Sequence, residues 1–217
     1  HTISVGKGKH KVGERLLINF PITILGDGDN EVVVVGGFMI KKGVQGNVHV
    51  QNMTIRHLGG SGVDGQSPFT LEDVIVEQCG TNGVVASGTA CVARCTNVEV
   101  RQCGYSGVVA YNGGSITLMG AKTTVHHNCT SGNSAFFGLY VHNANSKIQL
   151  VHPLTKEIVA TNNEGGGNWG AFHRADINQI QTILESICSD ELNVRCCREF
   201  QLEQFSGFIC LVYWSSA

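Results

Sequence analysis

The sequence is poor in charge and in proline, and it has no long apolar run. Only 15% of its 217 residues are charged, 3 are proline, and 15 Lys and Arg stand against 17 Asp and Glu. A formal net charge of −2 creates no long-range field for phosphate backbones, so we expect no nucleic acid as a partner. No apolar stretch reaches the ~18 residues of a membrane-spanning helix, so no membrane span is expected. The length suits one β-rich domain better than two independent domains.

Several motifs of enzymes and metal sites are also missing. The chain has no Gly-x-Ser-x-Gly motif, and Gly26-x-Gly28 lacks the strand and helix context of a phosphate-binding loop. Cys91-x-x-x-Cys95 and Cys196-Cys197 lack the paired spacing of a zinc site. Asp27-Gly28-Asp29 could bind calcium, but the same residues are ordinary in a turn, which we favour. We therefore expect no metal and no cofactor.

Cysteine is abundant, but its odd count excludes a complete set of disulfides. Free cysteine is among the most buried residue types, so we expect these thiols to fill a core. A reduced intracellular compartment or a virus particle is the expected location. The chain opens at His1 without Met, which indicates a processed chain or a fragment. The nine cysteines are Cys79, Cys91, Cys95, Cys103, Cys129, Cys188, Cys196, Cys197 and Cys210.

An internal repeat predicts the architecture. The segment Val74–Ala86 (VIVEQCGTNGVVA) recurs 24 positions later as Val98–Ala110 (VEVRQCGYSGVVA), with weaker copies beginning at Met53 and Thr123. Within each copy, apolar residues alternate, stop at Gly with Asn or Ser, and resume, which is the period of strands and not of helices. We predict an all-β, right-handed parallel β-helix over residues 1–170, a three-sided solenoid of about 21–24 residues per coil.

Stacked coils place equivalent residues in columns. Three columns on the first strand are predicted to point inward. The outward column Arg56, Glu77, Arg101 and His126 alternates in sign, and we interpret it as control of strand register and not as a catalytic group. His126 and His127 are expected to point in opposite directions, which argues against joint metal binding. The inward columns are Met53/Val74/Val98/Thr123, Ile55/Val76/Val100/Val125 and Leu58/Cys79/Cys103.

The N-terminal segments resemble those of the right-handed parallel β-helix superfamily that includes pectate lyases. They are Ile3–Gly8, Leu16–Ile18, Pro21–Gly26 and Gly36–Ile40. The chain is also similar to β-helix repeat proteins of large algal or amoebal viruses and of protists, chiefly through Asn128–Gly132, Pro153–Glu157 and Thr161–Asn163. The resemblance implies a fold and names no reaction. Enzymes of this superfamily need clustered acids and cations, and the carboxylates here are scattered.

The pattern changes after residue 170. Asp176 precedes apolar residues with helical spacing, which predicts a helix over 175–189. We expect residues 171–217, with the apolar finish Phe208–Trp214, to cap the open end of the solenoid or to dock on another subunit. The apolar positions of the expected helix are Ile177, Ile180, Ile183, Leu184 and Ile187.

The candidate binding site lies on the second strand of each coil. Tyr111 and His142 are expected to form one outward column with Ser87, and Tyr140 to form another with Asp64, Val85 and Val109. Such a flat strip could stack sugar rings or bury a partner chain, although the same residues also serve β propensity.

Two functions follow as hypotheses. The first is a non-catalytic module for structure, assembly or carbohydrate binding, with a polysaccharide or protein partner. The alternative is a polysaccharide lyase, epimerase or glycoside hydrolase that gathers its acids from separate coils. A cleft flanked by Asp64, Glu72, Glu99 and Arg101 would support the alternative.

Overall fold

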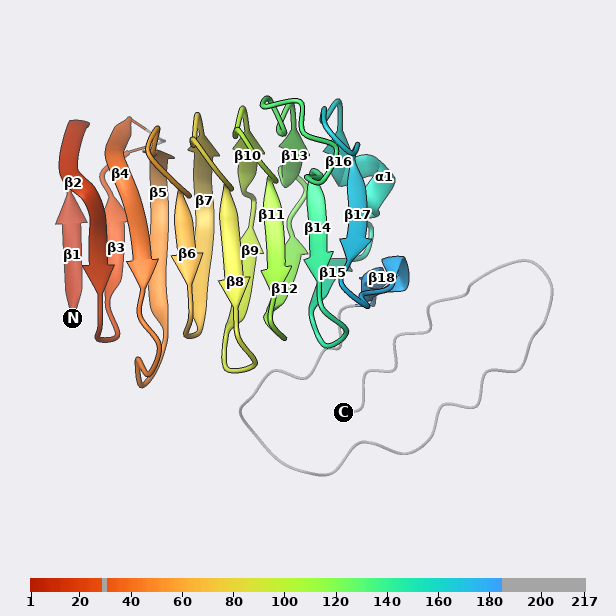
Figure 1. The fold of residues 1–217 in the computed structure, drawn as a ribbon. Helices are drawn as coiled ribbons and strands as arrows, with labels where there is room; N and C mark the ends of the chain where they lie inside the picture. Colours follow the sequence, from red (N-terminus) through yellow and green to blue (C-terminus); the bar gives the residue numbers. More distant parts are fainter. Residues whose placement is uncertain (29–30, 185–217) are drawn as a thin grey trace, which may run out of the picture. The chain divides into compact units, whose positions relative to one another are not determined.

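A computed structural model describes residues 1–28 and 31–184. In this part of the chain, parallel strands stack into a three-sided β-solenoid (Figure 1). The predicted all-β parallel solenoid is therefore confirmed. The only helices described are α1 (Lys156–Val159) and a 3-10 helix at Ile177–Gln179. No described helix has the length and apolar character to cross a membrane.

Each side of the solenoid is one ladder of parallel strands, and the longest strands bend to serve two ladders. The first face joins the bent strands β2 (Gly8–Ile18), β4 (Val32–Ile40), β5 (Val48–Arg56) and β7 (Phe69–Glu77) with β10 (Glu99–Arg101), β13 (Thr124–His126) and β16 (Ala160–Thr161). The second face joins the ends of β2 and β4 with β6 (Val63–Gly65), β8 (Val84–Ser87), β11 (Val108–Tyr111), β14 (Leu139–His142) and β17 (Trp169–Phe172). The third face joins β1 (Thr2–Val5), β3 (Thr23–Gly26), the starts of β5 and β7, β9 (Val92–Thr96), β12 (Ser115–Met119), β15 (Lys147–Val151) and β18 (Ile180–Ile183).

Two of the three inward columns lie in the core as predicted. Val76, Val100 and Val125 pair in register across the first face, and all three are fully buried. The third column is wrong at Leu58, whose side chain is 81% exposed. His57 is buried in its place. The backbone shows the reason: Gly80 N donates to His57 O just as Gly104 N donates to Cys79 O, so His57 is the true counterpart of Cys79.

The one-residue difference arises at a left-handed bend that follows the first face. Gln78, Gln102, His127 and Asn162 all have positive φ, between 52° and 55°. Backbone hydrogen bonds join Gln102 to His127 and His127 to Asn162, whereas Gln78 N donates to Arg101 O. The bend turns the next side chain back into the interior, which buries Cys79 and Cys103. The weaker copy at Arg56–His57 lacks the bend residue, and Leu58 therefore falls outside the column.

The described part of the predicted C-terminal helix forms a 3-10 turn and a strand instead. Asp176 does cap a helix, since its carboxylate accepts from Asn178 N at 2.7 Å, but only the 3-10 turn Ile177–Gln179 follows. The chain then enters β18, where Ile180 pairs with Ile148 and is buried. Strand pairing thus uses apolar residues that the spacing alone assigned to a helix. The remainder of that segment and the apolar finish lie outside the described residues, and the expected division at residue 170 stays a prediction.

The described cysteines are core residues, as expected. Cys79, Cys91, Cys95, Cys103 and Cys129 are free thiols, and all five are buried. Burial raises the pKa of Cys91, Cys95 and Cys129 to about 12, far above the ordinary value of 9.0. These thiols are therefore protonated at neutral pH, and they pack in the core as small apolar side chains.

Candidate functional site

An exposed line of rings runs across the second face of the solenoid. Tyr111, His142 and Phe172 occupy equivalent positions on β11, β14 and β17, as the register of the three strands shows. The ring centroids of Tyr111 and His142 are 4.7 Å apart, and those of His142 and Phe172 are 6.1 Å apart. His173 adds a fourth ring, 4.6 Å from His142. We call these four residues the aromatic strip.

Tyr111 and Phe172 are 37% and 55% exposed, so the strip presents ring surface to solvent. Sequence reasoning found Tyr111 and His142 but missed Phe172 and His173. The last copy of the repeat is hard to recognise in the sequence. Trp169–Phe172 pairs with Leu139–His142, but no paired positions carry the same residue.

The neighbouring column has the predicted register but is not open. Asp64, Val85, Val109 and Tyr140 stack in order. Val85, Val109 and Tyr140 are only 5–9% exposed, because they form a small cluster against which Phe137 packs. The expectation of an exposed column is therefore wrong. Tyr140 lies beside the strip, with its ring 5.8 Å from that of His142, and burial raises the pKa of its hydroxyl.

Asp64 shares the second face but lies away from the strip. Three rungs separate it from Tyr140, which corresponds to roughly 14 Å at ~4.8 Å per rung. Its carboxylate lies 3.8 Å from the Arg15 guanidinium. Burial raises the pKa of Asp64, and the charges of Arg15 and Lys41 oppose that rise. Of the four predicted site residues, the structure brings together only Tyr111, Tyr140 and His142.

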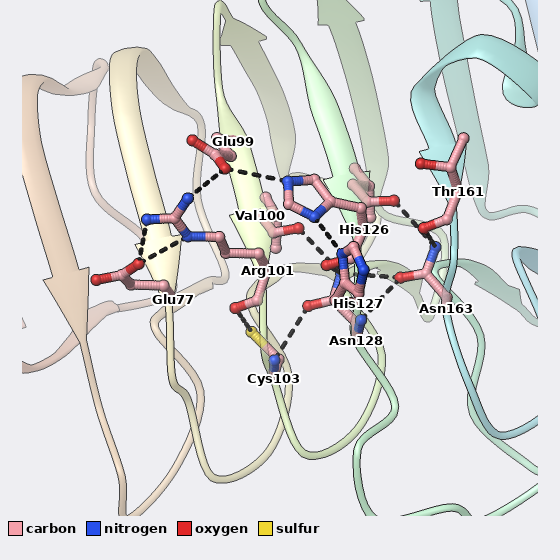
Figure 2. Close-up of polar contacts among 11 residues, drawn as sticks. Glu77, Glu99, Val100, Arg101, Cys103, His126, His127, Asn128, Thr161 and Asn163 are labelled. Carbon is pink, nitrogen blue, oxygen red and sulfur yellow. Dashed lines mark hydrogen bonds and ion pairs between the residues drawn. The ribbon is translucent and has the colours of Figure 1, made fainter.

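The outward column of the first face is a continuous network of charge, shown in part in Figure 2. Glu77 accepts from Arg56 Nε at 2.6 Å and from Arg101 Nε at 2.8 Å. Arg101 Nη1 also donates to Glu99 at 2.6 Å, and His126 Nε2 lies 3.0 Å from the same Glu99 oxygen. The predicted alternation of sign is thus real, and it joins neighbouring coils. We call this group the charge ladder.

Glu77 is the buried centre of the ladder, at 3% exposure. Burial alone would raise the pKa of its carboxyl, but hydrogen bonds and charges from Arg101 and Arg56 outweigh burial and lower it. Glu77 is therefore an ionised structural group that holds two arginines in place.

His126 and His127 meet, contrary to expectation. Their Nδ1 atoms are 2.8 Å apart and their rings lie nearly perpendicular, at 87° (Figure 2). An ordinary strand would turn the two side chains to opposite faces. The left-handed conformation of His127, with φ of 52°, turns its ring back toward His126.

Beside the histidines, a pair of asparagines continues the column of Cys79 and Cys103 into later coils. Asn128 is fully buried, accepts from Cys103 N at 3.1 Å and donates to Val100 O at 2.9 Å (Figure 2). Asn163 repeats the arrangement one coil later and accepts from the amide of Asn128 at 3.0 Å. The sequence carried this signal, since Asn128 stands where the earlier copies have cysteine.

The acids proposed for a catalytic cleft do not gather. Asp64 lies on the second face, Glu72 on the third and Glu99 on the first. Glu99 and Arg101 do share a strand, but they are bonded to each other. Within residues 1–28 and 31–184, no group of three or more His, Cys, Asp or Glu could hold a metal ion.

Comparisons of the chain with protein-family models, curated proteins and solved structures found no match in any of the three. The assignment as a parallel β-solenoid therefore rests on the strand ladders themselves. The likeness to pectate lyases and to viral repeat proteins stays a prediction.

Proposed function

We propose that the chain is a non-catalytic β-helix module that binds a carbohydrate chain along the aromatic strip. The observation that carries this proposal is the in-register line of Tyr111, His142 and Phe172 on successive rungs, with two of the three rings substantially exposed. Aromatic rings combine a large apolar face with polar atoms at their edges, which suits the alternating C–H and hydroxyl surface of a sugar.

Polar groups next to the strip support the same reading. Ser87 precedes Tyr111 by one rung, and a groove of about 340 Å³ at this corner is lined by Gln66, Ser87, Asn112 and four other residues. Hydroxyl and amide groups there can donate to and accept from sugar hydroxyls. A linear polymer lying along the solenoid axis would meet the groove first and the rings next.

The placement of the acids favours binding over catalysis. Glycosidases need two carboxyl groups that face one bond, and Asp64, Glu72 and Glu99 lie on different faces. Glu77 and Glu99 are both held by arginine. We therefore propose that the likeness to pectate lyases is one of fold and not of activity.

The test is a glycan array probed with the wild-type chain and with the double variant Tyr111→Ala, Phe172→Ala. Wild type should bind at least one polysaccharide, and the variant should bind it about tenfold more weakly with an unchanged circular dichroism spectrum. Leu58→Ala is the matched control, because Leu58 is exposed but distant from the strip in sequence and on another corner.

Equal binding by wild type and the double variant would contradict the proposal. The same samples should be assayed for new unsaturated or reducing ends, since turnover would favour a lyase or hydrolase. Absence of any glycan binding, with capture of a protein partner that the double variant fails to capture, would instead assign the strip to assembly.

A further inference from the structure

The pair His126 and His127 has the geometry of a metal site outside the aromatic strip. Their Nδ1 atoms are 2.8 Å apart, which is hydrogen-bond distance. His127 is exposed and the His126 side chain is 23% exposed, so an ion from solvent can reach this pair and replace the contact between the two nitrogens. Imidazole nitrogens are ligands for first-row transition metals.

The opposite nitrogen of His126 is already fixed by a carboxylate. His126 Nε2 lies 3.0 Å from Glu99, which in turn is held by Arg101 at 2.6 Å (Figure 2). A carboxylate behind a ligating histidine sets its tautomer and orientation, and such partners change metal affinity by about 10–100-fold. A proton on Nε2, donated to Glu99, makes Nδ1 the lone-pair nitrogen of His126, and in the absence of an ion this lone pair faces His127 Nδ1.

The separation of the two nitrogens also fits one coordination geometry better than another. With metal–nitrogen bonds of about 2.0 Å, two donors 2.8 Å apart subtend an angle of about 90° at the metal. That angle belongs to tetragonal Cu²⁺ or Ni²⁺, whereas the tetrahedral angle of Zn²⁺ would need a wider pair. Copper is also the strongest binder in the divalent series.

We propose that His126 and His127 together bind Cu²⁺ through their Nδ1 atoms, with Glu99 as a positioning residue. The described residues offer no third His, Cys, Asp or Glu ligand, so water completes the coordination and the site is open. Binding requires His127 to carry its proton on Nε2, so that its Nδ1 can donate a lone pair to the ion.

The experiment adds Cu²⁺ in sub-stoichiometric steps to the 217-residue chain and follows each histidine ring by NMR. We expect paramagnetic broadening of His126 and His127 before the other rings, and an electron paramagnetic resonance spectrum with two coupled imidazole nitrogens. The second-face pair His142 and His173 is resolved in the same spectra, so binding there cannot be mistaken for the proposed site.

Two variants and one control complete the test. His127→Gln should abolish the two-nitrogen signal, and it should fold, because Gln78 and Gln102 already occupy the same left-handed bend. Glu99→Gln should weaken binding by about 10-fold or more. His152→Gln, an exposed histidine elsewhere, should change nothing. Equal Cu²⁺ affinity of wild type and His127→Gln, or broadening that begins at other rings, would overturn the proposal. The two histidines would then be a hydrogen-bonded pair without a metal-binding role.

Discussion

One backbone angle at His127 decides what two neighbouring side chains can do together. In an extended conformation the rings of His126 and His127 would be separated by the strand, but φ of 52° brings their Nδ1 atoms to 2.8 Å. A left-handed conformation costs a non-glycine residue free energy. Here the backbone bonds from Gln102 N to His127 O and from His127 N to Asn162 O hold it in the stack.

At the same scale, Glu77→Gln should make the free energy of unfolding less dependent on pH in the acidic range. The pKa of Glu77 in the folded chain is lowered below its ordinary value of 4.5. Its contribution to stability is therefore complete above the unfolded-state pKa and is lost as the pH falls through the lower folded-state value. We expect the variant to be about 2 kcal/mol less stable at pH 7, because two arginines lose their shared carboxylate, and this deficit to shrink below pH 4.

Urea unfolding of wild type and Glu77→Gln between pH 3 and pH 7 measures the difference. If the difference in free energy of unfolding between wild type and the variant stayed constant from pH 3 to pH 7, the contribution of Glu77 would come from packing and not from its charge.

Val100→Asp should prevent folding. Val100 is fully buried between Val76 and Val125, and the substitution would place a charge there without a partner. The expected loss exceeds about 4 kcal/mol, measured as the absence of a cooperative thermal transition in circular dichroism. Arg94→Asp, on the exposed side of β9, is the control and should unfold like wild type. A normal melting curve for Val100→Asp would refute the inward assignment.

At the scale of the element, equivalent residues of successive coils act as one column. Cysteine fills the column after the left-handed bend in two coils, and asparagine fills it in the next two. The change from thiol to amide occurs where the bend residue itself changes from glutamine to histidine and asparagine. The Asn128 amide bonds to His126 O on its own coil, to Cys103 N on the coil before and to Asn163 on the coil after, so it ties three coils together.

Asn128→Ala should destabilise this element strongly. The substitution removes the acceptor of Cys103 N and the donor to Val100 O, and both backbone groups are buried. Each unsatisfied buried group costs about 1–3 kcal/mol, so we expect a loss of at least about 2 kcal/mol in the free energy of unfolding. Asn145→Ala, at an exposed turn, is the matched control and should lie within about 0.5 kcal/mol of wild type. Equal stability of the two variants would mean that water replaces the lost bonds.

For the solenoid as a whole, each coil contacts mainly its neighbours, so the described residues share one elongated core. That core runs from Ile18 and Ile22 near one end to Val159 and Ile180 near the other, and it includes four of the five buried thiols. The aromatic strip and the charge ladder lie outside it on different faces. The two proposed binding activities are therefore expected to be independent in mutational tests.

The thiols report on the integrity of this core. Cys79, Cys91, Cys95, Cys103 and Cys129 should resist alkylation by iodoacetamide in the native chain and react only in denaturant, since they are buried and the pKa of three of them is raised to about 12. Peptide mass spectrometry identifies each modified cysteine. Rapid labelling of Cys103 without denaturant would contradict a closed interior at the middle coils.

The sequence alone determined the repeat, the three strands of each coil and most inward columns, because alternation of apolar residues reports directly which side of a strand is buried. It also determined the sign pattern of the charge ladder, since outward residues one coil apart must be neighbours. Only the tertiary structure decided what depends on backbone conformation or on distant segments. The left-handed bend brings His126 and His127 into contact, and the absence of one residue from an earlier coil leaves Leu58 exposed. Phe137 packs against the column of Tyr140, and pairing with β15 forms a strand from residues predicted to be helical.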